Sequence, residues 1–266
     1  MSGHKGSVQL GAAKRWAEGL AAWKIPQQIL DQAPGSPWGF PPSLFAANDV
    51  PNSALHRVAR AALGGEGTVL DVGCGGGAAS IPLVPPATRL AGVDSSPDML
   101  RSFATAADKA GVSHEEVPGE WPDVSDRAPL SDVVVCRNVV YNVPTIVPFT
   151  KALTRRATRR VVVELTEFHP SVGLAPLWFQ FWGIRYPNGP TADMFIEVLS
   201  EMGYKLDAER EVRPSMKATS DPDRYLEFVR RRLCLDPSRD AEIAAALAET
   251  GQGQDEITVV VVSWQP

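Results

Sequence analysis

Short apolar runs alternate along this chain with longer segments in which apolar residues recur every three to four positions. The short runs predict strands at residues 69–72, 89–94, 112–117, 132–136, 160–165, 204–212 and 256–264. The longer segments predict helices at residues 8–20, 27–32, 52–63, 97–111, 143–153, 191–202, 221–235 and 238–250. Because strands that alternate with helices form a parallel sheet covered on both faces, the pattern predicts a doubly wound α/β fold.

Three segments exceed a minimal version of this fold. Residues 1–55 precede the main domain, which spans 56–266 and carries insertions at 166–190 and 214–251. We expect the extension and the insertions to form a helical cap and lids.

Aromatic residues concentrate in the insertion at 166–190 and in a proline-rich stretch that carries Trp38 and Phe40. Such a composition favours ordered structure over a floppy linker. Three interpretations remain open: a lid over a binding site, packing of the extension onto the core, and an interface in a homodimer.

The charge disfavours nucleic acid as a partner. The formal net charge is −5 and the isoelectric point is about 5.5, whereas nucleic-acid-binding domains usually carry a basic face. With 44% apolar residues, the chain can bury a sizeable core. The basic group at 155–160 is expected to be a solvated helix end.

The cysteines Cys74, Cys136 and Cys234 are odd in number and widely spaced, which disfavours a disulfide framework and a zinc site. No cluster of residues with metal-ligand spacing is visible, so we expect no metal. No apolar stretch is long enough to cross a bilayer, and no charged segment followed by an apolar run opens the chain. We therefore expect a cytoplasmic protein with no membrane partner.

The most informative stretch is 68–77, where an apolar run ends abruptly in glycines. Gly73, Gly75 and Gly77 allow positive φ and let a ligand approach the main chain. Residues 78–80 are expected to begin a short helix, stopped by two prolines at 85–86, whose start would offer free N–H groups. The glycine spacing also fits the dinucleotide fingerprint, so the glycines alone leave a nicotinamide cofactor open.

Two carboxylates near the glycines help to distinguish between the possible cofactors. Asp94 closes the next apolar run, at about the spacing of an acid that holds ribose hydroxyls, although it could instead cap the following helix. Asp71 precedes the glycines, where a pyrophosphate would gain nothing from an anion. A ligand with an ammonium group and a sulfonium would gain from it.

The segment 69–77 resembles the first motif of class I S-adenosylmethionine-dependent methyltransferases, and 92–100 resembles their second. The resemblance covers roughly 56–266 and implies a seven-stranded, mostly parallel sheet whose last strand, near 257–262, is antiparallel. It also implies that the cofactor is S-adenosyl-L-methionine. The cofactor-binding positions that it implies are Asp71, Gly73, Gly75, Gly77, Asp94, Ser95, Glu120, Trp121, Cys136, Arg137 and Asn138.

The resemblance divides these positions by role. Asp71 and the glycine backbone would hold the amino-acid end of the cofactor, Asp94 the ribose, and Glu120 the adenine. Arg137 and its neighbours follow the fourth strand, where the chain would pass beneath the methyl group. Arg137 is equally suited to pairing an acidic group of the substrate.

Two residues are candidates for catalysis. Tyr141 would face the methyl acceptor, although ordinary helix packing explains it equally well. His169 follows the fifth strand at the edge where open α/β sheets bind ligands. Since its reference pKa lies near 6.5, it is suited to act as a base toward a hydroxyl. Its alternative role is that of a loop residue with a backbone hydrogen bond.

The sequence thus predicts a methyltransferase that acts on a small, partly apolar molecule by in-line displacement. One alternative is an NAD(P)-dependent oxidoreductase, and another is a non-catalytic protein that binds the same cofactor. The acceptor atom, the need for a general base and the oligomeric state stay open, because many chemistries share this fold.

Overall fold

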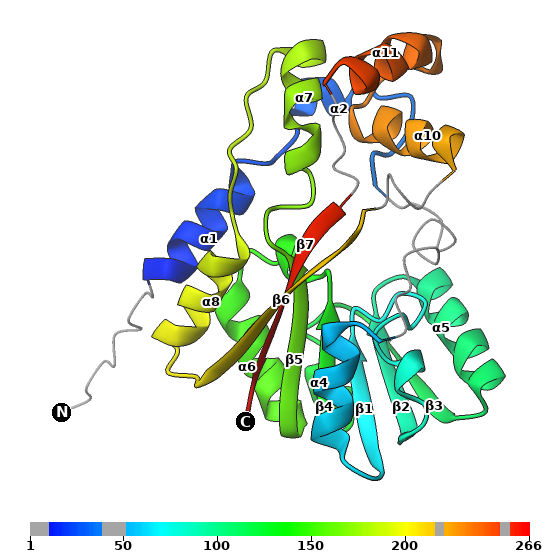
Figure 1. The fold of residues 1–266 in the computed structure, drawn as a ribbon, viewed down its shortest axis with the longest axis vertical. Helices are drawn as coiled ribbons and strands as arrows, with labels where there is room; N and C mark the ends of the chain where they lie inside the picture. The colour runs from blue at the N-terminus through cyan, green and yellow to red at the C-terminus, as the bar shows by residue number, and fades with distance from the viewer. Residues whose placement is uncertain (1–10, 39–51, 216–220, 251–255) are drawn as a thin grey trace.

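A seven-stranded sheet forms the centre of the molecule, in the order β3-β2-β1-β4-β5-β7-β6 (Figure 1). The computed structural model describes residues 11–38, 52–215, 221–250 and 256–266. Its strands are β1 (Gly67–Val72), β2 (Ala87–Asp94), β3 (Ser113–Pro118), β4 (Ser131–Arg137), β5 (Ala157–Thr166), β6 (Leu206–Pro214) and β7 (Glu256–Trp264). Neighbours from β3 to β5 pair in parallel, whereas β7 is antiparallel to β5 and β6. The predicted sheet is therefore confirmed.

Helices cover both faces of the sheet, as predicted. They are α1 (Gly11–Ala21), α2 (Gln27–Leu30), α4 (Ala54–Leu63), α5 (Pro97–Ala110), α6 (Ile146–Arg156), α7 (Ala175–Trp182), α8 (Ala192–Glu201), α10 (Pro222–Arg232) and α11 (Asp240–Thr250). On one face, α1, α6 and α8 bury Trp16, Phe149 and Phe195. On the other face, α4 and α5 bury Leu55 and Phe103. Within the described ranges, none of these helices is both long and apolar enough to span a bilayer.

Local chemistry explains the ends of α5, which match the sequence prediction closely. The Ser96 hydroxyl accepts a hydrogen bond from Met99 N (3.4 Å), and Pro97 occupies the first turn, where no N–H donor is needed. Gly111 ends the helix with φ 69°, a conformation that favours glycine. Ser96, and not Asp94, is therefore the cap of this helix, which leaves both carboxylate oxygens of Asp94 to other partners.

The prediction of a crossover helix after the glycine turn is wrong. Residues 78–80 form turns, and a single short 3-10 turn, Ile81–Leu83, follows before β2 begins at Ala87. Pro82 lies inside this segment and two more prolines follow at 85–86, so it lacks the N–H donors that an α-helix requires. The glycine turn consequently has no helix N-terminus behind it.

The next helix also begins later than predicted, at Ile146 instead of residue 143. Pro144 disfavours helical geometry in the residue before it, so residues 143–145 are irregular and connect the 3-10 turn Val140–Asn142 to the helix.

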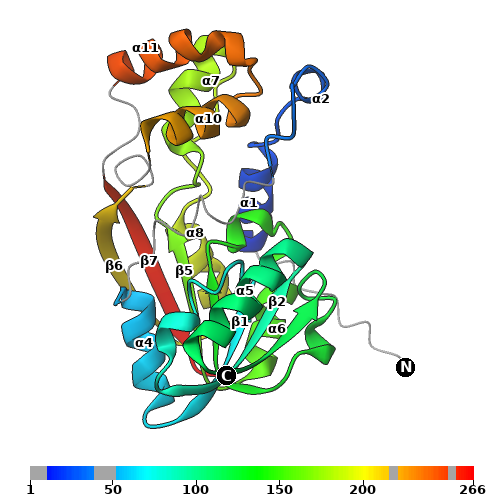
Figure 2. The ribbon, with the colours of Figure 1, turned by 90° about the vertical axis from the view of Figure 1, so that its right-hand side faces the viewer.

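The N-terminal extension divides between two parts of the molecule. Helix α1 packs against α8 and α6 on the body, whereas Ile29 of α2 joins a separate apolar cluster with α7, α10 and α11. We call α2, α7, α10 and α11 the cap. Figures 1 and 2 show α7, α10 and α11 together at one end of the molecule, and the chain enters them from the carboxyl ends of β5 and β6. The expectation for Phe40 falls outside the described residues.

Replacing Trp16 with alanine should lower the free energy of unfolding by about 3–5 kcal/mol, the usual cost of removing a buried aromatic ring. Trp16 is fully buried, stacks on Tyr141, and donates a hydrogen bond from Nε1 to Val143 O (2.9 Å). Urea denaturation followed by circular dichroism measures the change. The matched control is Lys14→Ala on the exposed side of the same helix, expected within about 0.5 kcal/mol of the parent. Equal stability of both variants would show that α1 does not stabilise the body.

Candidate functional site

The glycine turn folds over the carboxyl ends of β1 and β2. Gly73 N and Cys74 N both donate to Val93 O, at 2.8 and 3.0 Å. Gly75 N donates to Asp94 Oδ2 (3.0 Å), and Ser96 N donates to Asp94 Oδ1 (2.9 Å). These bonds orient the Asp94 carboxylate at the sheet edge, and each of its oxygens retains a second lone pair for a ligand.

The glycines are required by geometry at two positions. Gly73 has φ 71°, and a Cβ there would lie 2.3 Å from Val139 Cγ2. Gly77 has φ 86°, and a Cβ there would lie 2.6 Å from Ile81 Cγ1. Gly75 differs, because a Cβ there would meet nothing within 4 Å. The turn is thus tightly packed on its inner side and open at Gly75, as a surface that receives a ligand must be.

Asp71 is a buried carboxylate, and one of its two oxygens accepts no hydrogen bond. Its exposed fraction is 1%, and Oδ2 accepts a hydrogen bond from Ser80 Oγ (2.6 Å). Oδ1 is buried and has no hydrogen-bond partner. Burial raises the pKa of this carboxyl to about 7, against the opposing effects of the Ser80 hydroxyl and the Arg137 charge. A cationic group beside Oδ1 would satisfy the oxygen and favour its ionised form.

Arg137 lies at the centre of a chain of buried charges. Its Nε donates to Glu164 Oε1 (2.9 Å), the cross-strand neighbour on β5, and its Nη1 lies 3.4 Å from Ala78 O in the glycine turn. Arg213 Nη2 donates to the same Glu164 oxygen at 2.8 Å. Glu164 is fully buried, and Arg213 is 8% exposed.

Sequence reasoning singled out Arg137 but assigned no role to Glu164 or Arg213. The only available signal was Glu164 itself, a charge inside an apolar run.

His56 of α4, which sequence reasoning did not single out, contacts the backbone of the glycine turn. Its Nε2 lies 3.1 Å from Ala78 O, and its Nδ1 lies 3.0 Å from Ser53 Oγ. Because a carbonyl oxygen only accepts, Nε2 carries the proton and Nδ1 accepts from Ser53. Burial lowers the pKa of this imidazole, which keeps it neutral.

The other expected cofactor positions are not all at the surface of the site. Ser95, Glu120 and Asn138 are exposed near the ends of β2, β3 and β4. Cys136 is fully buried in the core on the α6 face, so its thiol does not line the edge and only its backbone is available. Trp121 packs against the same core, and its Nε1 donates to Phe149 O (3.3 Å).

Tyr141 is held by its surroundings. It is 6% exposed, and its hydroxyl donates to Thr166 O (2.7 Å). Its ring stacks on Trp16 and meets the edge of His169, with centroids 5.4 Å apart in both cases. Burial raises the pKa of the phenol, so it stays protonated.

His169 is oriented by a hydrogen bond from the loop that follows it. Ser171 N donates to its Nδ1 (3.3 Å), which leaves the ring proton on Nε2. Burial, with a smaller effect from the Arg232 charge, lowers its pKa to about 4. A neutral ring whose Nδ1 lone pair is occupied has no free lone pair with which to accept a proton. This arrangement argues against the expected base and favours a donor.

An aromatic stack connects this edge to the cap. The Trp23 ring stacks on His169 at 4.4 Å and on Tyr186 at 4.6 Å, and Tyr186 meets the edge of Trp178 in the cap at 5.5 Å. Trp23 is anchored further by a hydrogen bond from Nε1 to Gly189 O (2.5 Å). The stack fixes the position of His169 relative to the cap.

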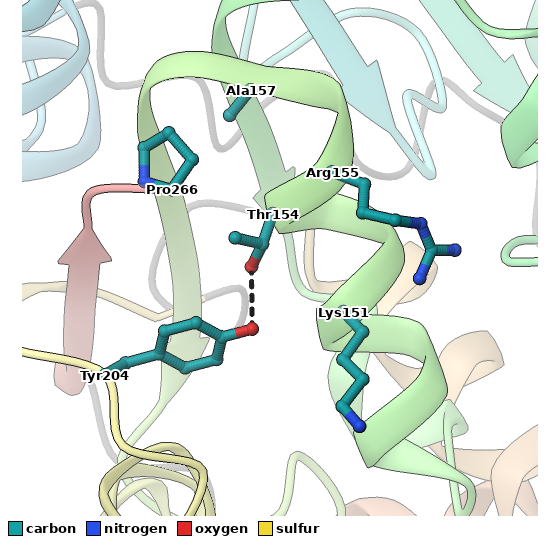
Figure 3. A pocket seen from close by; sticks show the side chains of 6 residues that line it. All are labelled: Lys151, Thr154, Arg155, Ala157, Tyr204 and Pro266. Atoms are coloured by element: carbon teal, nitrogen blue, oxygen red, sulfur yellow. Dashed lines mark hydrogen bonds between the residues drawn. The ribbon is translucent and has the colours of Figure 1, made fainter.

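A hollow of about 510 Å³ lies elsewhere, and the residues that line it are Lys151, Thr154, Arg155, Ala157, Tyr204 and Pro266 (Figure 3). Ala157 begins β5, so the hollow lies at the end of the sheet opposite the two carboxylates. It contains none of the expected site residues. Among the described residues, no group of three or more His, Cys, Asp and Glu side chains could hold a metal ion.

The chain matches known proteins in its central part. Residues 69–160, roughly a third of the chain, match the family model of the methyltransferase domain. The chain is 33% identical over 84 residues to a ubiquinone biosynthesis O-methyltransferase of Methylobacterium sp. strain 4-46. That match covers 32% of this chain and 34% of the relative, so the chain spans about a third of the relative's length.

Solved structures share the whole fold at low sequence identity. A protein of Bacillus halodurans C-125, provisionally described as a methyltransferase, superposes with a TM-score of 0.52 at 15% identity, covering 79% of this chain and 96% of that one. Magnesium protoporphyrin IX methyltransferase of Synechocystis PCC 6803, solved with bound S-adenosylhomocysteine, has a TM-score of 0.51 at 12% identity. It covers 94% of this chain and 95% of that one.

A doubly wound sheet with a glycine turn between two strand-end carboxylates defines a Rossmann-like fold. Residues 69–160 match the model of the methyltransferase domain, and the described chain has the fold of solved methyltransferases, with β7 antiparallel to β5.

The residues at this edge fit S-adenosylmethionine, the cofactor that the sequence resemblance implies. The buried, unpartnered Oδ1 of Asp71 matches an ammonium group, the open side of Gly75 admits a ligand, and the oriented Asp94 carboxylate matches two hydroxyls.

Binding of S-adenosylhomocysteine should release a proton near pH 6. The raised pKa keeps Asp71 largely protonated below about pH 7, and a ligand ammonium favours the ionised carboxylate. Affinity should therefore fall as the pH decreases from 7 to 5.5. Titration calorimetry in buffers of different ionisation enthalpy measures the released proton.

The control for this experiment is Asp71→Asn, which should bind more weakly and release no proton from this position. Binding with no proton release and no pH dependence in the parent protein would contradict the assigned state of Asp71.

Proposed function

We propose that this protein transfers a methyl group from S-adenosyl-L-methionine to a small, partly apolar molecule. One observation carries the proposal: a buried carboxylate oxygen of Asp71 without a partner, beside an open glycine turn and one strand away from Asp94. This arrangement suits a ligand that has a cationic group at one end and ribose hydroxyls at the other. It does not suit a pyrophosphate, whose charge would repel Asp71.

The cofactor supplies a methyl group that its sulfonium already activates for displacement. The chain then has to bind, align and exclude water. In this proposal Asp71 accepts from the ammonium group, Asp94 accepts from the ribose hydroxyls, and the exposed Glu120 after β3 accepts from the adenine amino group. The backbone at Gly73 and Gly75 supports the amino-acid end.

We infer that the acceptor lies on the side of His169 and Tyr141, where the aromatic stack supplies an apolar wall. In this proposal the Nε2–H of His169, whose Nδ1 accepts from Ser171 N, orients an acceptor oxygen by donating to it. The relative named as a ubiquinone biosynthesis O-methyltransferase makes oxygen acceptors the first class to test, and phenols combine such an oxygen with an apolar ring. The acidic net charge supports a small molecule over nucleic acid.

A second candidate function is cofactor binding without catalysis. The observation that favours it is the state of the two expected catalytic residues in the described structure. His169 has its Nδ1 occupied, and the Tyr141 hydroxyl donates to Thr166 O. Neither residue is poised to remove a proton, so a phenolic acceptor would have to arrive ionised or lose its proton to water.

Calorimetry with S-adenosylmethionine and S-adenosylhomocysteine, with NADH and NADPH in parallel, tests the cofactor. Micromolar binding of the first pair alone is expected, and binding of a nicotinamide nucleotide in their place would overturn the proposal. Incubation with S-adenosylmethionine and a panel of phenols, followed by mass spectrometry, then tests transfer. Cofactor binding with no product across acceptors of all classes would favour the non-catalytic role.

Replacing Asp94 with asparagine should weaken the binding of S-adenosylhomocysteine by about 10- to 100-fold, the contribution of a hydrogen bond to a charged group. The amide turns an N–H toward a position where Gly75 N or Ser96 N already donates, and it removes the charge from the ribose contact. Calorimetry measures the affinity, and thermal unfolding checks the fold. Asp98→Asn, an exposed carboxylate on α5, is the matched control and should leave affinity unchanged. Parental affinity in Asp94→Asn would remove Asp94 from the site.

A further inference from the structure

The glycine turn in this protein lacks the usual source of positive charge. An α-helix that starts behind such a turn would present a positive dipole end and free N–H groups to an anionic ligand group. Here only turns and the 3-10 segment Ile81–Leu83 follow. A carboxylate bound at this turn therefore needs another cation.

Arg137 is positioned to supply that cation. It ends β4, the strand beside β1, and register places Asp71 opposite Val135. Since side chains two residues apart in a strand share a face, Asp71, Arg137 and Glu164 all lie on one face of the sheet, at its carboxyl edge. The guanidinium reaches the turn itself, at Ala78 O.

Glu164 fixes the orientation of Arg137. It accepts from Arg137 Nε and from Arg213 Nη2 through a single oxygen, Oε1. Its other oxygen, Oε2, is buried without a hydrogen-bond partner, and so is Arg213 Nη1. The network thus retains a buried donor and a buried acceptor, which is costly unless a ligand or water completes it.

The charges of this network select the kind of ligand. Asp71 and Glu164 carry two negative charges when ionised, and Arg137 and Arg213 carry two positive ones. A zwitterion adds one charge of each sign and preserves this balance in a buried region. A pyrophosphate would leave its negative charges beside two carboxylates without compensation.

We propose that Arg137 binds the carboxylate of the cofactor's amino-acid end while Asp71 takes the ammonium group. Glu164, backed by Arg213, acts as the positioning residue for Arg137. The proposal rests on the proposed use of S-adenosylmethionine and adds to it a residue that discriminates the amino-acid end.

Three ligands test this assignment by calorimetry. They are S-adenosylhomocysteine, its decarboxylated analogue, which keeps the ammonium group, and 5′-methylthioadenosine, which lacks the amino-acid end. In the unaltered protein, loss of the carboxylate alone should weaken binding by about 10- to 100-fold. This comparison needs no variant.

Variants then assign the effect to residues. Arg137→Gln should weaken the binding of S-adenosylhomocysteine by a similar factor. It should bind the decarboxylated analogue as tightly as it binds S-adenosylhomocysteine. Its affinity for 5′-methylthioadenosine should stay within threefold of the parent, which also reports an intact adenosine site. Glu164→Gln should weaken the binding of S-adenosylhomocysteine, the one ligand of the three with a carboxylate, and leave the affinity for the other two unchanged. A general structural role would not produce this selectivity. Arg89→Gln, an exposed arginine near the start of β2, is the matched control and should change nothing.

Equal affinity of the unaltered protein for S-adenosylhomocysteine and its decarboxylated analogue would overturn the proposal. So would equal weakening of all three ligands in Arg137→Gln. If the unaltered protein binds none of the three, the proposed function itself fails, and that outcome is distinct from the other two.

Discussion

The need to pair buried charges organises the carboxyl edge of this sheet. Asp71, Arg137, Glu164 and Arg213 come from β1, β4, β5 and β6, and each is almost entirely removed from water. An isolated buried charge is costly, so the four strands can end together only if these side chains face one another. The pairing leaves Asp71 Oδ1, Glu164 Oε2 and Arg213 Nη1 unsatisfied. A structure that tolerates such groups usually reserves them for a ligand or for water.

Side-chain contacts, and not the backbone of a helix, hold the glycine turn in position. Backbone hydrogen bonds of an α-helix would normally fix the residues after such a turn. Here Ser80 donates to Asp71, while His56 and Arg137 both approach Ala78 O. The turn is therefore attached to three separate elements by side chains. Such attachment keeps its N–H groups and open face in one geometry, which reduces the ordering that ligand binding would have to impose.

The cap is joined to this edge by ring stacking. Trp23 lies between His169 and Tyr186, and Tyr186 contacts Trp178 of the cap. A cap held by aromatic rings has an apolar inner contact and a defined distance from the strand ends. The burial that makes this contact also makes His169 neutral, with a pKa of about 4. Burial of His169 in the ring stack thus explains both its packing against the cap and its neutral state.

The sequence alone determined the strands of the sheet and the motif residues Asp71 and Asp94, because strand periodicity and the glycine spacing are local patterns. The antiparallel direction of the last strand was implied by the family resemblance. Local patterns also produced the error after the turn, where prolines at 82, 85 and 86 outweighed the helix-forming residues at 78–80. Only the tertiary structure decided the partners of Arg137. Glu164 lies 27 residues away in sequence and Arg213 lies 49 residues from Glu164, and their contact follows from strand order. It also decided that Cys136 and Tyr141 are packed into the core and that His169 Nδ1 accepts from Ser171 N, since burial and the tautomer depend on neighbours that sequence spacing does not reveal.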